Sequence, residues 1–381
     1  MSITRIILAV TIFFSIYGGA NYYIARRLYQ WLNVFCQHIN VKIYTGIYIF
    51  IAVSMIFAFL PIPRDVKDII SWISSYWMGI FIYLLIFLLA MDFVILLGSI
   101  AKIIPSPIPK SVCFYKGLIP ILLTMGFVGY GMYNANQVEH VSYDIQLKEN
   151  TLSSDIKIVM ISDLHLGAIN SEKNLERVVQ GINDMKPDIV CIVGDIFNDD
   201  FNAIRNPSGA INLFRSINAT YGVYACLGNH DGGRTLDQMI NFLQESNIKL
   251  LNDEYVIIEK RLALFGRLDS NHIGGSGELK RQDITDDIAS VGANMPVIVM
   301  DHNPSHIEEY GKEVDLILAG HTHRGQLFPA NLITNAIFVV DYGYYQKDAH
   351  SPQVVLTSGS GTWGMPMRVG SNNEIVSIIL H

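Results

Sequence analysis

Four long apolar runs fill the first third of the chain, and they restrict that part to helices that a membrane can hold. Each run is close to the roughly 20 residues that a helix needs to cross a hydrocarbon core. Proline-rich joints follow the second and third runs, at 61–65 and 105–109. A buried bundle in a soluble protein is the alternative, but four runs with almost no interior charge argue against it. We therefore expect an all-α transmembrane region of about four helices within residues 1–135. The candidate spans are Ile6–Ile24, Ile43–Leu60, Trp72 to about Leu97, and Leu118–Met132.

Charge is divided unequally between this region and the remainder of the chain. Residues 1–135 hold nine Lys and Arg against three acidic residues, a net charge of +6, whereas the whole chain carries −7. Residues 136–381 therefore carry −13. Such an acidic surface is unsuited to nucleic-acid phosphates, but it suits a site whose positive charge comes from bound metal ions. We expect membrane lipids and a phosphorylated substrate as partners and no nucleic acid, and we infer no protein partner.

The loops between the runs indicate the side of the membrane. The first and third loops carry a clearer excess of Lys and Arg than the second, which places them in the cytoplasm by the positive-inside rule. With an even number of spans, the catalytic part then lies outside the cytoplasm. Met1–Ala20 also resembles a signal peptide, and its removal would leave three spans and invert this argument. We favour four spans, because Arg26 and Arg27 directly follow the first run, as a cytoplasmic anchor should. Asp92, late in the third run, is either a functional acid within the membrane or an interfacial one.

From about Val141 onward, short strands alternate with helices, and residues 140–381 read as an α/β catalytic domain. Five apolar, strand-like runs each end directly before residues of the types that bind metals. Since the carboxyl ends of strands in an α/β sheet are where sites assemble, these residues are expected to converge. The runs are Ile156–Ile161, Asp188–Val193, Gly222–Leu227, Pro296–Met300 and Val314–Ala319. Cys191 and Cys226 lie inside such runs, and we expect them to be packed thiols.

Hydrolysis of a phosphoester at neutral pH needs a strong nucleophile and neutralisation of the phosphoryl charge. Two divalent ions about 3.5–4 Å apart supply both, because a bridging water becomes hydroxide. Two pairs of ligands here, Asp163 with His165 and His321 with His323, are spaced i, i+2, which puts both side chains on one face of an extended segment. The candidate metal ligands are Asp163, His165, Asp195, Asn229, His302, His321 and His323.

Taken in order, these motifs resemble those of the calcineurin-like metallophosphoesterase superfamily. They are Asp163-x-His165, Gly194-Asp195, Gly228-Asn229-His230-Asp231, His302 and Gly320-His321-x-His323. The resemblance covers about Val141 to His381. Its C-terminal part, Ser358 to Trp363 followed by Pro366-Met367-Arg368, is similar to the membrane-associated bacterial branch of the superfamily.

The resemblance implies a two-sheet metallophosphoesterase sandwich flanked by helices. It also implies two divalent metal ions, manganese, iron or zinc, with Asp195 as the bridging ligand. One ion would be held by Asp163, His165, Asp195 and His323, and the other by Asp195, Asn229, His302 and His321. His230 matches the histidine that faces the phosphate and protonates the leaving group or stabilises the transition state.

This sequence departs from the superfamily pattern at a few positions. Many members have an acid three residues after the bridging aspartate, which pairs with the motif histidine, whereas this chain has Asn198. Asp199 and Asp231 are then the candidates for orienting His230. Arg324 is a candidate for binding the substrate phosphate or is a solvated loop cation. Arg368 is a candidate phosphate clamp or a structural ion pair.

The sequence thus predicts a membrane-anchored, dinuclear-metal phosphoesterase that attacks a phosphoester or pyrophosphate with a metal-bridging hydroxide. A lipid-linked substrate is favoured, because a membrane-tethered site meets lipid headgroups at high effective concentration. A phosphodiesterase for soluble nucleotides is the alternative substrate class. There are two alternative functions. A non-catalytic metal-binding sensor or scaffold is one, and the complete ligand set argues against it. A transporter with an accessory domain is the other, and the nearly uncharged spans argue against it.

Overall fold

The computed structural model describes residues 3–36, 38–57, 60, 62–147, 154–169, 172–269, 271–273, 275, 277 and 279–381. The chain forms two compact units, which meet within a helix: residues 1–130 and residues 131–381. The predicted boundary, between residues 135 and 140, lies a few residues further along.

The first unit consists of apolar helices. Three of the described helices are long and apolar enough to cross a membrane, and the second helix, at 17 residues, is shorter. The first helix continues beyond the predicted span, so Arg26 and Arg27 lie within it rather than in a loop. The helices are α1 (Ile3–Leu32), α2 (Val41–Phe57), α3 (Arg64–Ile100) and α4 (Lys110–Asn134).

Asp92 of α3 lies in a polar cluster inside this unit. Its carboxylate pairs with Arg27 of α1, lies 3.0 Å from Nζ of Lys116 of α4 and accepts a hydrogen bond from the hydroxyl of Tyr23 at 2.8 Å. A carboxylate among apolar helices is costly unless it is paired. Asp92 therefore links three helices, and its charge is offset by two cations.

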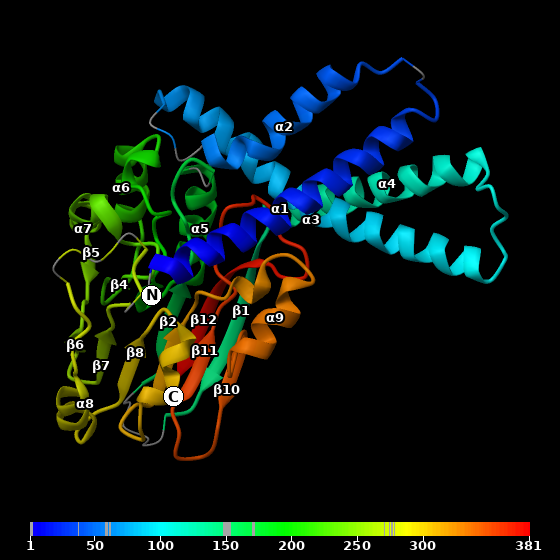
Figure 1. The fold of residues 1–381 in the computed structure, drawn as a ribbon. Coiled ribbons are helices and arrows are strands. Elements are labelled where there is room, and N and C mark those ends of the chain that lie inside the picture. The colour runs from blue at the N-terminus through cyan, green and yellow to red at the C-terminus, as the bar shows by residue number, and fades with distance from the viewer. Residues whose placement is uncertain are drawn as a thin grey trace. The chain divides into compact units, whose positions relative to one another are not determined.

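Two mixed sheets, each of six strands, face one another in the second unit (Figure 1). The first sheet has the order β1-β12-β2-β3-β4-β5 and the second the order β10-β11-β9-β8-β7-β6. The first sheet contains β1 (Val138–Ile145), β2 (Ile156–Ile161), β3 (Ile189–Val193), β4 (Val223–Cys226), β5 (Ile248–Leu250) and β12 (Asn373–Leu380). The second contains β6 (Glu254–Ile258), β7 (Leu262–Gly266), β8 (Val297–Met300), β9 (Leu316–Ala319), β10 (Gly343–Gln346) and β11 (Gln353–Leu356).

Strands β3, β7, β8 and β9 are apolar on both faces because the middle of each sheet is covered on both sides. Ile158 and Met160 of β2 point into the core between the sheets, and Val159 and Ile161 point into the core beneath the outer helices. This alternation follows from the two-residue period of a strand. The outer helices are α5 (Glu172–Met185), α6 (Pro207–Arg215) and α7 (Leu236–Glu245) on the first sheet, α8 (Thr285–Gly292) on the second, and α9 (Ala330–Ile337), with 3₁₀ turns η1 (Phe201–Ala203), η2 (Gly233–Thr235), η3 (Pro304–Glu309) and η4 (His323–Gly325).

The predicted fold class, a two-sheet sandwich with flanking helices preceded by apolar helices, is confirmed. Cys191 and Cys226 are buried free thiols, as predicted. The central strands β2, β3 and β4 run parallel, as do β8 and β9. Their carboxyl ends therefore lie at a common edge of each sheet, where the candidate ligands follow.

Candidate metal centre

Each candidate ligand lies two to four residues beyond the end of a parallel strand. Five of these ligand residues have positive φ angles: Asp163 (54°), His165 (46°), Asp195 (50°), His321 (74°) and His323 (49°). This left-handed conformation is uncommon outside glycine and collects at functional sites, where tertiary contacts enforce it. The chain thus turns sharply after β2, β3 and β9, and the turns direct these side chains toward one another.

Two motif glycines make the close approach possible. A Cβ on Gly194, which has a φ of 73°, would lie 2.6 Å from Nδ1 of His302. A Cβ on Gly320 would lie 2.6 Å from Oδ2 of Asp163. Both distances are shorter than real Cβ contacts, so a larger residue at either position would displace a candidate ligand.

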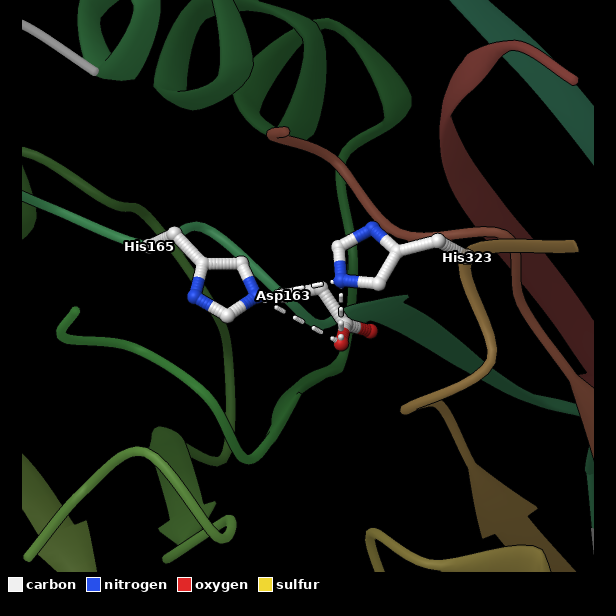
Figure 2. Close-up of side chains that lie close together, drawn as sticks. All are labelled: Asp163, His165 and His323. Atoms are coloured by element: carbon white, nitrogen blue, oxygen red, sulfur yellow. Dashed lines mark hydrogen bonds and ion pairs between the residues drawn. The ribbon is translucent and has the colours of Figure 1, made fainter. Parts of the chain in front are cut away.

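The first ligand group contains Asp163, His165 and His323, all buried (Figure 2). Their ligand atoms lie within 4.8 Å of one another. The Nε2 atom of His323 is 3.3 Å from Oδ1 of Asp163 and 3.0 Å from Nε2 of His165. Figure 2 shows both imidazole rings directed at the carboxylate between them.

The second ligand group contains Asp195, His302 and His321, again with ligand atoms within 4.8 Å of one another. Asn229 joins this group, because its Oδ1 lies 2.8 Å from Nδ1 of His321. Asp195 connects the two groups: its Oδ2 is 3.1 Å from Nε2 of His302 and 3.7 Å from Nε2 of His165. This is the position that a bridging carboxylate requires. The structure therefore brings all seven predicted ligands together in the two sets expected from the resemblance.

The donor set fits two divalent ions of the borderline class, because neutral imidazoles and carboxylates are their usual ligands. Burial lowers the pKa of His165 to about 3 and that of His321 to about 4, so both rings are neutral at neutral pH and offer a lone pair. Nδ1 of His302 lies 2.8 Å from the carbonyl of Val193, which holds the ring in place, as outer partners of metal-binding histidines do.

The carboxylates near His302 favour a positive charge beside its ring. Its Nε2 atom is buried and makes no hydrogen bond, although it faces Oδ2 of Asp195. Burial alone lowers the pKa of His302, but the carboxylates of Asp195 and Asp163 outweigh burial and raise that pKa well above its ordinary value. A cation between these groups satisfies both the nitrogen and the carboxylates.

His230 lies beside the first ligand group, with its ring centroid 5.1 Å from that of His165. Its Nδ1 is 2.8 Å from Oδ1 of Asp199, and its backbone N–H donates to Oδ1 of Asp195. Burial lowers the pKa of His230, but the hydrogen bond to Asp199 and the nearby carboxylates raise it above the ordinary value overall. A raised pKa suits a general acid near neutral pH.

Asp199, and not Asp231, is the residue that orients His230. Asp231 is buried and accepts hydrogen bonds from the backbone N–H groups of Gly228, Ile196 and Phe197, so it holds the two motif loops together. The sequence left these two acids as alternatives because both lie close to a motif. Asp199 reaches His230 because it has a positive φ of 63°.

Arg368 is fully buried and is a hydrogen-bonding hub for the C-terminal loop. Its five N–H groups donate to the carbonyls of Ser358, Gly361 and His323 and to the hydroxyl of Ser371, at 2.6–3.3 Å. Burial lowers its pKa to about 10, so it remains charged at neutral pH. The predicted contact with a substrate phosphate is not supported by this placement, since every donor already has an acceptor. Arg368 instead positions the backbone of His323.

Arg324 is exposed, and its guanidinium carbon lies 4.3 Å above the ring of Tyr342. It directly follows His323, so a phosphate contact stays a prediction.

Trp363 was not singled out from the sequence. It is half exposed and has its ring centroid 5.6 Å from that of His230. Gln326 holds it there by hydrogen bonds to its backbone N–H and carbonyl. The only sequence feature that pointed to Trp363 was the run of small residues Ser358–Thr362 directly before it.

Arg368→Met is expected to lower the melting temperature of the protein by roughly 6–12 °C. At least three buried carbonyls would lose their donor, at about 1 kcal/mol or more each, and each kcal/mol corresponds to about 2–4 °C in a unit of this size. Thermal unfolding of the full chain in nanodiscs measures the change. Arg324→Met is the matched control; loss of its exposed cation–π contact, about 0.5–1 kcal/mol, predicts a shift of roughly 1–4 °C. Equal shifts in the two variants would contradict the role of Arg368.

Known proteins share this pattern. Residues 156–325 match the calcineurin-like phosphoesterase family. An uncharacterized metallophosphoesterase of Aquifex aeolicus is 31% identical over 242 residues, which cover 62% of this chain and 90% of that protein. An uncharacterized metallophosphoesterase of Campylobacter jejuni is 27% identical over 96% of both chains. A Danio rerio transmembrane protein with a metallophosphoesterase domain is 26% identical, over 82% of this chain and 74% of that protein. The ordered ligands, the two-sheet fold and these relatives together show that this chain belongs to the calcineurin-like metallophosphoesterase family, whose members are metal-dependent phosphoesterases.

Proposed function

We propose that the chain is a membrane-anchored, two-metal phosphoesterase whose substrate is a lipid-linked phosphoester or pyrophosphate. The observation that carries the reaction type is the position of Asp195, which lies within reach of both ligand groups. Two divalent ions bound there would supply an activated water and neutralise the charge on the phosphoryl oxygens.

The seven ligands would hold the two ions, and His230 would supply a proton. The seven ligands converge from strand ends of both sheets, so the packed core holds them in place. With Nδ1 of His230 bonded to Asp199, Nε2 is the ring atom available to protonate the leaving oxygen. Trp363 lies against His230, with its ring centroid 5.6 Å from that of the imidazole.

Membrane anchoring supports the lipid-linked class of substrate. α4 ends at Asn134 and β1 begins at Val138, so the first strand of the metal-binding unit follows a helix of membrane-spanning length after three residues. A site tethered so closely meets membrane substrates at high effective concentration. Soluble nucleotides lack this advantage and remain the second candidate class.

Purified full-length protein in nanodiscs tests the substrate class. After metal removal and addition of manganese, iron or zinc in turn, we expect kcat/KM to be at least tenfold higher for lipid pyrophosphates presented in the bilayer than for soluble diesters or nucleotides. Equal or better hydrolysis of a soluble nucleotide would overturn the lipid-linked class. Absence of turnover on every substrate, with two metals bound per chain, would favour the non-catalytic alternative.

The metal-binding unit is proposed to lie outside the cytoplasm, because the Lys and Arg residues at the adjoining ends of α1 and α2, and of α3 and α4, outnumber those at the adjoining ends of α2 and α3. Ser208 is a suitable labelling position, since it is exposed, whereas the side chain of Asn206 accepts the N–H of Gly209 and caps α6. In a Cys36→Ser, Cys113→Ser background, Ser208→Cys is expected to react with a membrane-impermeant maleimide in intact cells. Reaction only after lysis would place the unit in the cytoplasm.

A further inference from the structure

The outward side of α9 is apolar to a degree that is unusual for an exposed helix. Leu332, Ile333 and Ile337 are 61%, 60% and 69% exposed, and no residue of α9 is buried. No charged residue occurs from Gly325 to Val340. A surface helix of a soluble domain normally presents charged residues to water, and exposed apolar patches mark interaction sites. We call this surface the α9 apolar face; it consists of Phe328, Leu332, Ile333, Ile337 and Val339, all exposed.

This face adjoins the metal centre. Phe328 follows the η4 turn that carries His323, and the ring of Phe338, at the other end of α9, lies 6.0 Å from that of His321. Asp341 links the η4 turn to α9. Its carbonyl accepts a hydrogen bond from the hydroxyl of Thr322, next to His323, and its carboxylate accepts one from the hydroxyl of Thr334 in α9. Whatever binds the α9 apolar face is therefore held beside the candidate ligands.

The same face begins close to the end of the membrane-length helix α4. The last turn of α4, from Gly131, belongs to the metal-binding unit. The backbone N–H of Arg368 donates to the carbonyl of Gly131, and that of Phe328 donates to the carbonyl of Val369, the next residue. The side chain of Asn134 donates to the carbonyl of Ser371 in the same loop. One short loop thus separates the end of α4 from the start of the α9 apolar face.

We propose that the α9 apolar face inserts into the surface of the lipid bilayer that holds the helices of this chain. Three observations support a bilayer as the occupant: the face is apolar and uncharged, the described part of the chain contains three helices of membrane-spanning length, and the face lies beside the end of one of them. An amphipathic helix in this position lies in the interface plane with its apolar side among the acyl chains. The metal centre is then held at headgroup level. This inference concerns where the unit contacts lipid and does not depend on the proposed substrate.

Spin-label accessibility in nanodiscs tests the insertion directly. The full chain carries Cys36→Ser and Cys113→Ser, with a nitroxide at Ile333→Cys, and is reconstituted at one chain per disc in phosphatidylcholine and phosphatidylglycerol. We expect the ratio of relaxation by oxygen to relaxation by an aqueous nickel chelate to be severalfold higher at position 333 than at the control label, Ser208→Cys on α6. An equal ratio at the two positions would overturn the proposal. The proposal would also be overturned if the high ratio at position 333 appeared only with several chains per disc. That result would mean that a second copy of the chain covers the face.

A second pair of variants separates docking from chemistry. Leu332→Glu with Ile333→Glu is expected to lower kcat/KM for a substrate embedded in the bilayer about tenfold, while turnover of a soluble aryl phosphodiester stays within twofold. The control is Ile257→Glu on the edge strand β6, which replaces an isoleucine that is 45% exposed and lies away from the α9 apolar face. Equal losses on the bilayer substrate in both variants would contradict a specific role for α9. Failure to hydrolyse any lipid substrate would overturn the proposed function and leave the accessibility result intact.

Discussion

Asp195→Asn is expected to abolish turnover and to reduce the bound metal to below two ions per chain. Its carboxylate lies within reach of His165 in one group and His302 in the other, so the variant weakens both ion sites at once. Metal ions stabilise the phosphoryl transition state by several kcal/mol, and each 1.4 kcal/mol is tenfold in rate, so kcat/KM should fall by roughly 10³-fold or more. Elemental analysis of the protein together with steady-state rates measures both effects.

The fold should survive this change. Asparagine keeps Oδ1, which accepts the backbone N–H of His230, and it removes a buried charge that only a cation can offset. Asp199→Asn is the matched control for metal content, because it makes the same change beside the centre at a residue outside both ligand groups. Two metals per chain in Asp195→Asn, at normal occupancy, would disprove the bridging role.

His230→Ala is expected to keep both metals while kcat falls by roughly 10²–10⁴-fold, the range for loss of a general acid. The loss should be largest for substrates with poor leaving groups, such as alkyl esters, since these need protonation. It should be small for a nitrophenyl ester, whose leaving group departs as an anion. Comparing the two substrates therefore distinguishes proton donation from a merely structural role. Near-normal kcat on an alkyl ester would remove His230 from the reaction.

Asp199→Asn provides the companion measurement for His230. Asp199 raises the pKa of His230, so its removal lowers that pKa. A general acid acts when protonated, so activity is lost as pH rises through the pKa of the acid. The alkaline limb of the pH–rate profile should therefore move to lower pH in Asp199→Asn, with a 10–100-fold loss of kcat, the size expected for an orienting carboxylate. An unmoved alkaline limb would show that Asp199 does not act through His230.

The sequence by itself determined the class of fold and the set of candidate ligands. Apolar strands that end in Asp, Asn and His predict a site at the carboxyl edge of a sheet, because parallel strands end together. The i, i+2 spacing of Asp163 with His165, and of His321 with His323, is local, so it could be read without knowing the fold. The helices of the first unit could also be predicted from the sequence, because mostly apolar stretches of this length leave few alternatives.

Only the tertiary structure decided which partner each polar side chain takes. Asp199 and Asp231 are both close to a motif, and the choice between them depends on the direction of each chain turn and on contacts with residues 31 to 35 positions away. Arg368 looked equally suited to a phosphate and to the protein interior until the structure showed that loop carbonyls and the hydroxyl of Ser371 take all its donors. Asp92 likewise needed α1 and α4 beside it before its two cations could be identified. A hydrogen bond or ion pair requires a few ångströms and a defined angle, and distant segments meet that requirement only after the chain has folded.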